Sequence, residues 1–223
     1  MAHLSSAAQT AVSDPQTWVP VVAAGLLVAA DVDKDWSRDL AEDQPLFGKD
    51  AENTSDKFRD AATIAYVVTA LGAPSQDVGD KARGLAVGVS TMIMDGVLTQ
   101  GLKDLTGRER PDGSNDESFP SGHVSKASSR SNMAIRNLAY MDLEPWLHQT
   151  AAWTFRSIGV GAALSRVETD KHHLCDVLVG YAVGHFISTF MYEAFMADAT
   201  DGASLSFVPV PEGGALKLTL PLR

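Results

Sequence analysis

The sequence predicts an all-α protein, a helical bundle with a small β-hairpin at its C-terminal end. Apolar residues recur at spacings of three and four along most of residues 15–198, the period of a helix with one buried face. Glycine and proline break this pattern at few places, chiefly 72–74 and 107–120. After residue 200, leucines alternate with Lys217 and Thr219, which is the period of a strand.

The first four expected helices are 15–30, 34–43, 54–72 and 78–103. The first contains an apolar run and stops at an acidic cluster, and the same acids begin the second helix. A Gly-Ala-Pro sequence separates the third helix from the fourth.

The last three expected helices, which follow the breaker-rich segment, are 122–140, 144–164 and 170–198. Strands are expected around a Pro-Glu-Gly-Gly turn, at 206–210 and 215–222. We therefore expect one helical domain, 1–200, with a motif core at 85–197, and a hairpin extension, 201–223. Two strands alone are marginally stable in water, so the hairpin must pack on the bundle, on a membrane surface or on another chain in an oligomer.

The composition is that of a folded protein with a negative surface. The chain has 223 residues, of which 45% are hydrophobic, and can bury a sizeable core. Its formal net charge of −10 argues against nucleic-acid partners, because a negative field repels phosphate polymers. The single cysteine, Cys175, excludes an internal disulfide and is expected to be a buried, inert thiol.

No clear membrane span is expected from the apolar runs. A span needs about 20 apolar residues, whereas both long runs, 85–102 and 177–197, contain polar side chains. These interruptions are Ser90, Asp95, Gln100, His185, Ser188 and Glu193. Peripheral membrane contact is therefore the most that we expect. The N-terminal residues show no basic segment followed by an apolar core, the mark of a secretory signal.

Three short segments, 103–111, 120–123 and 165–176, carry polar residues suited to a phosphate site. Their candidate site residues are Lys103, Arg110, Ser121, Gly122, His123, Arg166, His172 and Asp176. Each segment alone is typical of an ordinary ion pair, turn or helix cap. Together, in this order, they supply cations for a phosphate, backbone N–H groups at a helix start, and two histidines.

His172 and Asp176 are four positions apart, so on a helix they would share one face and could form a hydrogen bond. A carboxylate bound to one ring nitrogen leaves the other nitrogen basic, which makes His172 a plausible nucleophile. The nearby cations could neutralise the equatorial oxygens of a phosphoryl group. His123 is the remaining histidine in a motif and the natural general acid and base.

With these residues in this order, the chain resembles the type 2 phosphatidic acid phosphatase superfamily, which includes class A acid phosphatases and vanadium haloperoxidases. The resemblance covers residues 85–197. It implies a helical bundle of the acid phosphatase and haloperoxidase type, and a metal-independent phosphohydrolase with no cofactor that vanadate inhibits. It also implies a periplasmic protein, or one at a membrane that faces the periplasm.

Carried over position by position, the resemblance implies a phosphohistidine at His172, with Asp176 beside it and His123 as general acid and base. The residues that would bind the substrate phosphate are Lys103, Arg110, Ser121, Gly122 and Arg166.

The chain departs from the family pattern in residues 167–171, which read Val-Glu-Thr-Asp-Lys where many members have an aromatic residue and a glycine. Glu168 and Asp170 would repel a polyanionic substrate if they faced the site. The loop 112–119 is also short and acidic. These departures bear on the choice of substrate rather than on the type of reaction.

Other polar residues are expected outside the catalytic set. On a helix, His173 would be turned about 100° from His172, and His185 lies in an apolar helix as a hydrogen-bonded core histidine. The acidic run 31–42 has the oxygen spacing of a calcium loop. Trp36 stands where such a loop needs glycine, so a helix start is preferred.

The predicted function is hydrolysis of phosphate monoesters or of lipid phosphates and pyrophosphates. Family analogy and the apolar helices favour a lipid substrate, while a phosphorylated small molecule stays open. One alternative is a vanadate-dependent haloperoxidase, which bromide oxidation after vanadate loading would identify. Another is a non-catalytic phosphate-binding or scaffold protein, which would bind phosphate without turnover.

Overall fold

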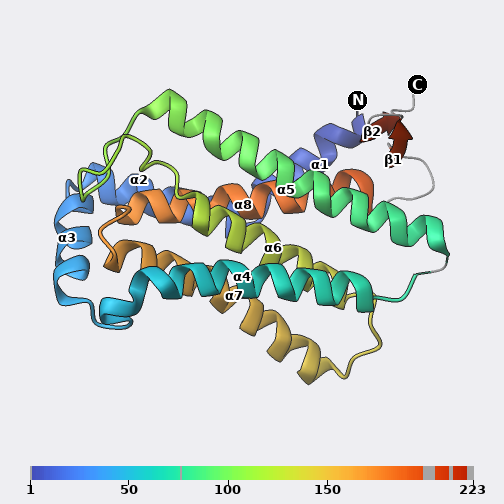
Figure 1. The fold of residues 1–223 in the computed structure, drawn as a ribbon, viewed down its shortest axis with the longest axis horizontal. Coiled ribbons are helices and arrows are strands. Elements are labelled where there is room, and N and C mark those ends of the chain that lie inside the picture. Colours follow the sequence, from blue (N-terminus) through green and yellow to red (C-terminus); the bar gives the residue numbers. More distant parts are fainter. Residues whose placement is uncertain (1, 76, 198–203, 211–212, 220–223) are drawn as a thin grey trace.

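The computed structural model describes residues 2–75, 77–197, 204–210 and 213–219. This part of the chain forms eight α-helices, one 3-10 turn and a two-stranded hairpin (Figure 1). The helices are α1 (Ala2–Ser13), α2 (Pro15–Ala29), α3 (Asp33–Asp43), α4 (Ala51–Gly72), α5 (Val78–Thr106), α6 (Gly122–Leu138), α7 (Pro145–Glu168) and α8 (Leu174–Phe195). The 3-10 turn is η1 (Gly48–Asp50), and the strands are β1 (Ser204–Val210) and β2 (Gly213–Thr219). The predicted helical bundle is confirmed.

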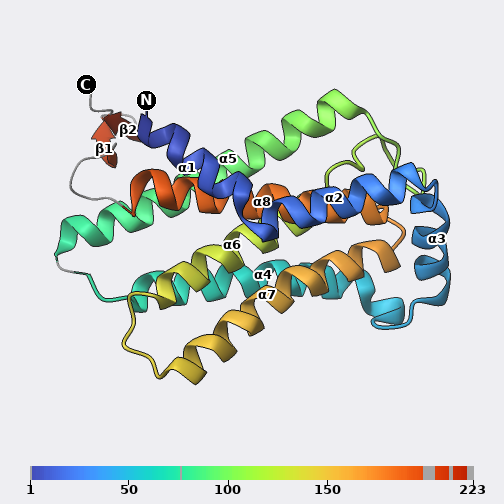
Figure 2. The ribbon, with the colours of Figure 1, turned by 180° about the vertical axis from the view of Figure 1, so that it is seen from behind.

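Seven of the eight helices correspond to predicted ones, whereas α1 was not predicted. Its sequence is mostly small and polar, and packing rather than an apolar stripe holds it in place. Ala7 is buried in a cluster with side chains of α8, and the ring of His3 contacts the carbonyl oxygen of Ala194 at 3.0 Å. Figure 2 shows α1 and α2 lying over α8.

Helix α6 lies at the centre of the bundle and packs on α4, α5, α7 and α8. Its contact with α8 is a close approach of two backbones. A Cβ atom on Gly180 would lie 2.6 Å from the carbonyl oxygen of Ser121, and one on Gly184 would lie 2.1 Å from that of Ser125. Small residues four positions apart let helices approach in this way, which is a common arrangement in membranes.

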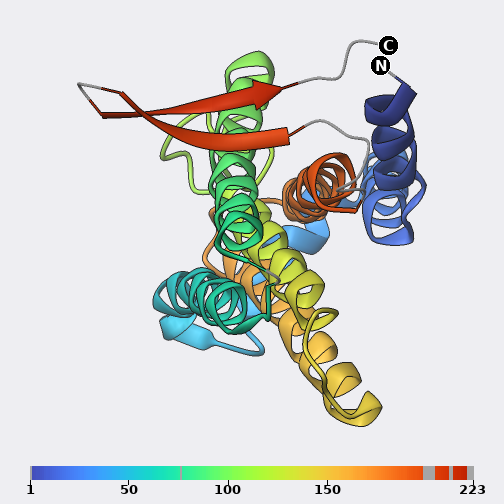
Figure 3. The same ribbon diagram turned by 90° about the vertical axis from the view of Figure 1, so that its right-hand side faces the viewer.

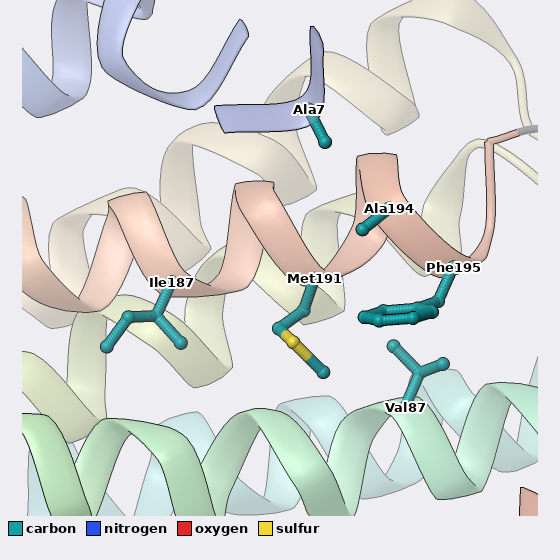
Figure 4. Close-up of a cluster of buried hydrophobic side chains, with 6 residues drawn as sticks. All are labelled: Ala7, Val87, Ile187, Met191, Ala194 and Phe195. Carbon is teal, nitrogen blue, oxygen red and sulfur yellow. The ribbon is translucent and has the colours of Figure 1, made fainter. Parts of the chain in front are cut away.

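Apolar side chains fill the bundle in two clusters. One joins α1, α5 and α8 through Ala7, Val87, Ile187, Met191, Ala194 and Phe195 (Figure 4). The other joins α4, α6, α7 and α8 through Ala62, Val124, Ala127, Ala162, Val167 and Val177. The packing of these buried side chains fixes the helices relative to one another.

The expectation of no clear membrane span is wrong. Within the described part of the chain, two helices, α5 and α8, are long and apolar enough to cross a membrane, and the number rises to three if α2 and α3 form one bent span. Only 33% of the most apolar 18-residue stretch of α5 is buried inside the bundle. The helix instead exposes large apolar side chains, including Val89, Ile93, Met94, Val97 and Leu98.

Three of the polar residues that interrupt these helices in the sequence, Asp95, Glu193 and His185, have partners on neighbouring helices or loops inside the protein. Asp95 is buried and accepts hydrogen bonds from Ser125 and Ser129 of α6. In α8, Glu193 pairs with Arg136 at 2.7 Å. His185 contacts Asp14 at 3.1 Å, which confirms the predicted core histidine. Because each of these three groups has an internal partner, it does not prevent its helix from facing lipid on the other side.

Helix α3 lies across one end of the bundle, where α2 and α3 meet at 101° (Figures 1 and 2). This helix begins within the acidic run, at Asp33, as the preferred interpretation of that run required. Strands β1 and β2 pair antiparallel beside α5, seen from the end of the bundle in Figure 3. The rest of the predicted second strand, 220–222, lies outside the described residues, and the division into two domains stays a prediction.

Candidate active site

The three motifs meet at the end of the bundle that α3 crosses, on the left in Figure 1. Lys103 lies in the last turn of α5, and Arg166 lies in the last turn of α7. Ser121 is the N-cap residue of α6, and His172 belongs to the short connection between α7 and α8. Helix ends that are distant in the sequence thus converge on one place.

Three cations surround His172. Burial, followed by the charges of Arg166, Arg110 and Lys103, holds the pKa of His172 well below its ordinary value. Burial and the charge of Arg110 also lower the pKa of Arg166 to about 10. Lys103 Nζ donates to the carbonyl oxygen of Glu117. The Nε atoms of both arginines are buried and have no hydrogen-bond partner among the described residues. Mutually repelling cations with unpaired donors suit an anion.

The imidazole of His172 is buried and held in one orientation. Its Nδ1 atom lies 2.6 Å from the carbonyl oxygen of Ser118. A carbonyl oxygen can only accept, so Nδ1 carries the proton of the neutral ring and Nε2 keeps its lone pair. His172 therefore has the protonation state that a nucleophile requires.

The direct hydrogen bond that we expected between Asp176 and His172 is not formed, since Asp176 Oδ2 and His172 Nδ1 are 3.9 Å apart. The expectation assumed a helix from residue 170, but α8 begins at Leu174, so the two residues do not share a helical face. Asp176 Oδ2 instead accepts hydrogen bonds from Ser118 Oγ, at 2.5 Å, and from the backbone N–H of His173, at 2.8 Å. Asp176 thus reaches His172 through Ser118. His173, expected on a helix, is the N-cap residue of α8.

The predicted phosphate donors Ser121 and Gly122 lie beside the cations. A Cβ atom on Gly122 would be 3.9 Å from Lys103 Cε. The backbone N–H of Ser121 donates to the carbonyl oxygen of Asp176 at 2.9 Å, so this N–H is occupied. Ser121 Oγ is buried and makes no hydrogen bond in the described part of the chain, which leaves the hydroxyl as the donor that Ser121 could offer.

His123 lies on the α4 side of the site and is partly open to solvent. Its Nε2 atom is 3.1 Å from Asp56 Oδ1 and 3.1 Å from Arg59 Nη1. Burial, and then the charge of Arg166, lower the pKa of His123 to about 4, although Asp56 opposes this shift. The ring is therefore neutral at pH 7 unless a bound anion offsets the charge of Arg166.

Residues 84–198, which contain all three motifs, match the family model of the PAP2 superfamily. The chain belongs to the PAP2 superfamily. The resemblance inferred from the motif residues is thereby confirmed.

Two relatives illustrate how this PAP2 chain compares with known proteins. It is 34% identical over 100 residues to the lipid A 1-phosphatase of Porphyromonas gingivalis, a match that covers 45% of this chain and 21% of the relative. The chain thus spans about a fifth of that protein's length. The crystal structure of a transmembrane PAP2-type phosphatidylglycerolphosphate phosphatase from Bacillus subtilis has the same fold, with a TM-score of 0.60 and 18% identity. That likeness covers 86% of this chain and 94% of the other.

Two of the acidic residues that distinguish this PAP2 chain, Glu168 and Asp112, form contacts with groups other than the three cations around His172. Glu168 is buried and accepts hydrogen bonds from the backbone N–H groups of Leu46 and Phe47, at 2.9 and 2.8 Å. Asp112, in the acidic loop, pairs with Lys171 at 2.6 Å. Glu168 therefore organises the turn after α3 and does not face the site.

Several residues around the PAP2 motifs were not identified from the sequence. Asp33 and Arg108 are 75 positions apart and form an ion pair, and Asp56 contacts His123 from 67 positions away. No local pattern marks such pairs, because only the packing of α3 and α4 against the motif loops brings them together. Among the described residues, no three His, Cys, Asp or Glu side chains are grouped so as to hold a metal ion.

Proposed function

We propose that this chain is a membrane-embedded phosphatase that hydrolyses lipid phosphate monoesters through a phosphohistidine at His172. The observation that carries the proposal is the buried imidazole whose Nδ1 faces the Ser118 carbonyl and whose surroundings are three cations. This arrangement supplies a neutral nucleophile and the charge that a phosphoryl group needs during transfer.

In the first step, Nε2 of His172 attacks phosphorus, and a P–N bond forms as the bond from phosphorus to the alcohol oxygen breaks. Protonated His123 gives its proton to the leaving oxygen. A phosphate dianion beside His123 raises its pKa from about 4, because opposite charge favours the protonated ring. In the second step, water attacks phosphorus, His123 takes the proton of that water, and the P–N bond breaks to release inorganic phosphate.

A lipid substrate is supported by the surface that leads to the site. Large exposed apolar side chains occur on α2, α4 and α5, the helices whose ends frame this region. The two relatives named above are both phosphatases, of lipid A and of phosphatidylglycerolphosphate. A lipid held beside these helices would present its phosphate to the cations at the end of the bundle.

The test is release of phosphate from a lipid phosphate and from para-nitrophenyl phosphate by the detergent-purified chain in excess chelator. His172→Ala is expected to lower kcat by more than about a thousandfold, the usual scale for loss of a nucleophile. The control, His148→Ala, removes a histidine far from the site on α7 and should retain full activity. Equal activity of His172→Ala and the unmodified chain would contradict the proposal, and bromide oxidation after vanadate loading would indicate a haloperoxidase instead.

We further propose that the site faces the periplasm, which the motif resemblance to the class A acid phosphatases supports. Residue 116 lies in the loop at the site end of α6, and residue 142 lies in the loop at its other end. Because Cys175 is buried, Asp116→Cys and Asp142→Cys each introduce one accessible thiol. A membrane-impermeant maleimide applied to intact spheroplasts should label Asp116→Cys alone, and labelling of Asp142→Cys alone would reverse the orientation.

A further inference from the structure

Arg108 is not one of the predicted site residues, and it bridges two buried carboxylates. Its Nη1 lies 2.7 Å from Asp176 Oδ1, and its Nη2 lies 2.8 Å from Asp33 Oδ2. The side chains of Asp176 and Asp33 are only 0% and 6% exposed. Two neighbouring carboxylates that are shielded from water would repel each other without a cation between them. The two Nη groups of one guanidinium can bind both carboxylates at once.

The same network continues to the nucleophile. The hydroxyl of Ser118 donates to Asp176 Oδ2, and the backbone N–H of Ser118 donates to the carbonyl oxygen of Arg108 at 2.9 Å. Ser118 is completely buried, and hydrogen bonds hold both its hydroxyl and its backbone N–H. Its own carbonyl oxygen then accepts the Nδ1 proton of His172. The orientation of the imidazole therefore depends on where Arg108 and Asp176 hold Ser118.

Helix α3 also fixes the chain just after His172. The first N–H groups of a helix have no partner within that helix, and in α8 two of them bind side chains of α3. The N–H of Cys175 donates to Asp33 Oδ1 and that of Leu174 donates to Ser37 Oγ, both at 2.8 Å. Ser37 is itself held by the carbonyl oxygen of Asp33 at 2.5 Å. A helix that crosses the end of the bundle thus caps the helix that follows the nucleophile.

We propose that Asp33 and Arg108 are positioning residues, which hold Asp176 and Ser118 so that Ser118 keeps His172 in its Nδ1–H tautomer. This inference rests on the proposed function for its kinetic consequence but not for the state of the ring. Changing a residue that orients a metal-ligating histidine typically lowers activity by about 10- to 100-fold, and we expect a similar scale for residues that orient His172.

The test compares Asp33→Asn and Arg108→Lys with the control Asp35→Asn. Asp35 also lies in the first turn of α3 but is exposed and pairs only with Arg38 of the same helix among the described residues. Asp33→Asn removes the charge that holds Arg108, and lysine at position 108 cannot bridge two carboxylates as a guanidinium does. Each variant is examined by steady-state kinetics on para-nitrophenyl phosphate, and by ¹H–¹⁵N spectra of the histidine rings, with His172→Ala to assign the signals.

We expect kcat to fall by about tenfold or more in both variants, with KM changed less than twofold, and no change in the control. We also expect the Nδ1–H signal of His172 to shift or to divide between two tautomers. Variants that melt at a lower temperature but keep both kcat and the His172 signal would show that the network only stabilises the fold, and would overturn the proposal. If Asp33→Asn does not fold, Arg108→Lys decides. If the unmodified chain releases no phosphate, the proposed function fails while the ring spectra still test the positioning.

Discussion

The imidazoles of the buried His172 and the partly exposed His123 are both uncharged in the folded protein near neutral pH, because burial and neighbouring cations disfavour the protonated ring. An unfolded chain protonates a histidine near pH 6.5, whereas the folded chain protonates His123 only near pH 4 and His172 well below its ordinary value. Between these limits the unfolded state binds more protons than the folded state. Their contribution to stability is therefore full above pH 6.5 and is lost as the pH falls toward 4.

We predict that the melting temperature in detergent decreases between pH 6.5 and 4, and decreases less steeply in His123→Asn. Asp112 is not expected to contribute to this decrease. Burial raises its pKa, but hydrogen bonds with Lys171 and Ser114 outweigh burial and lower the pKa to about 2. Its contribution is lost mainly below this range. An identical pH dependence in His123→Asn and the unmodified chain would show that His123 does not titrate as described. Adding vanadate should shift the His123 ring titration to higher pH.

At the residue level, the fixed spacing within the motifs predicted that Lys103, Arg166 and His172 would lie near one another, and the structure places them so. Sequence reasoning could not identify Arg108 or Asp33, whose partners lie far away in the sequence. It also paired Asp176 directly with His172, because a four-residue spacing implies contact only if both residues lie on one helix. The motif spacing thus indicates which residues gather, while loop geometry decides which of them bind each other.

Among the helices, the close approach of α6 and α8 predicts which glycine substitution lowers the stability of the fold. Gly184→Ala would place a Cβ atom 2.1 Å from the Ser125 carbonyl oxygen, so the helices must separate. We expect a destabilisation of about 1–3 kcal/mol, the usual cost of overpacking, measured by thermal or denaturant unfolding in detergent. Gly96→Ala in α5 is the matched control, because nothing lies within 4 Å of its added methyl group. The prediction fails if both variants are as stable as the unmodified chain.

Helix positions were largely predictable from the period of apolar residues, but two features of the elements were not. Helix α1 lacks a strong apolar stripe, and its burial against α8 only becomes visible in three dimensions. The spans were missed because Asp95 and Glu193 were counted as interruptions. The structure shows that an acid within an apolar helix can be satisfied by a neighbouring helix, here by serines of α6 and by Arg136.

For the whole molecule, the exposed apolar surface of α5 predicts where an introduced arginine would oppose membrane insertion. Ile93 lies near the middle of α5 and is 53% exposed, and Leu105 lies at its end and is 84% exposed. Ile93→Arg is expected to oppose membrane insertion by about 2.5–3.5 kcal/mol, whereas an arginine at position 105 can reach the interface at little cost. Alkaline extraction of membranes should therefore release Ile93→Arg but not Leu105→Arg. Equal retention of both would show that α5 does not face lipid.

The placement of the cations at the end of an apolar bundle has a consequence for how turnover depends on concentration. If the substrate reaches them from within the membrane, encounters are governed by its mole fraction in the plane and not by its amount per volume of solution. Mixed micelles diluted with an inert detergent, at constant bulk concentrations of enzyme and lipid phosphate, should then show slower turnover of the lipid. A water-soluble ester would be hydrolysed at an unchanged rate in the same series.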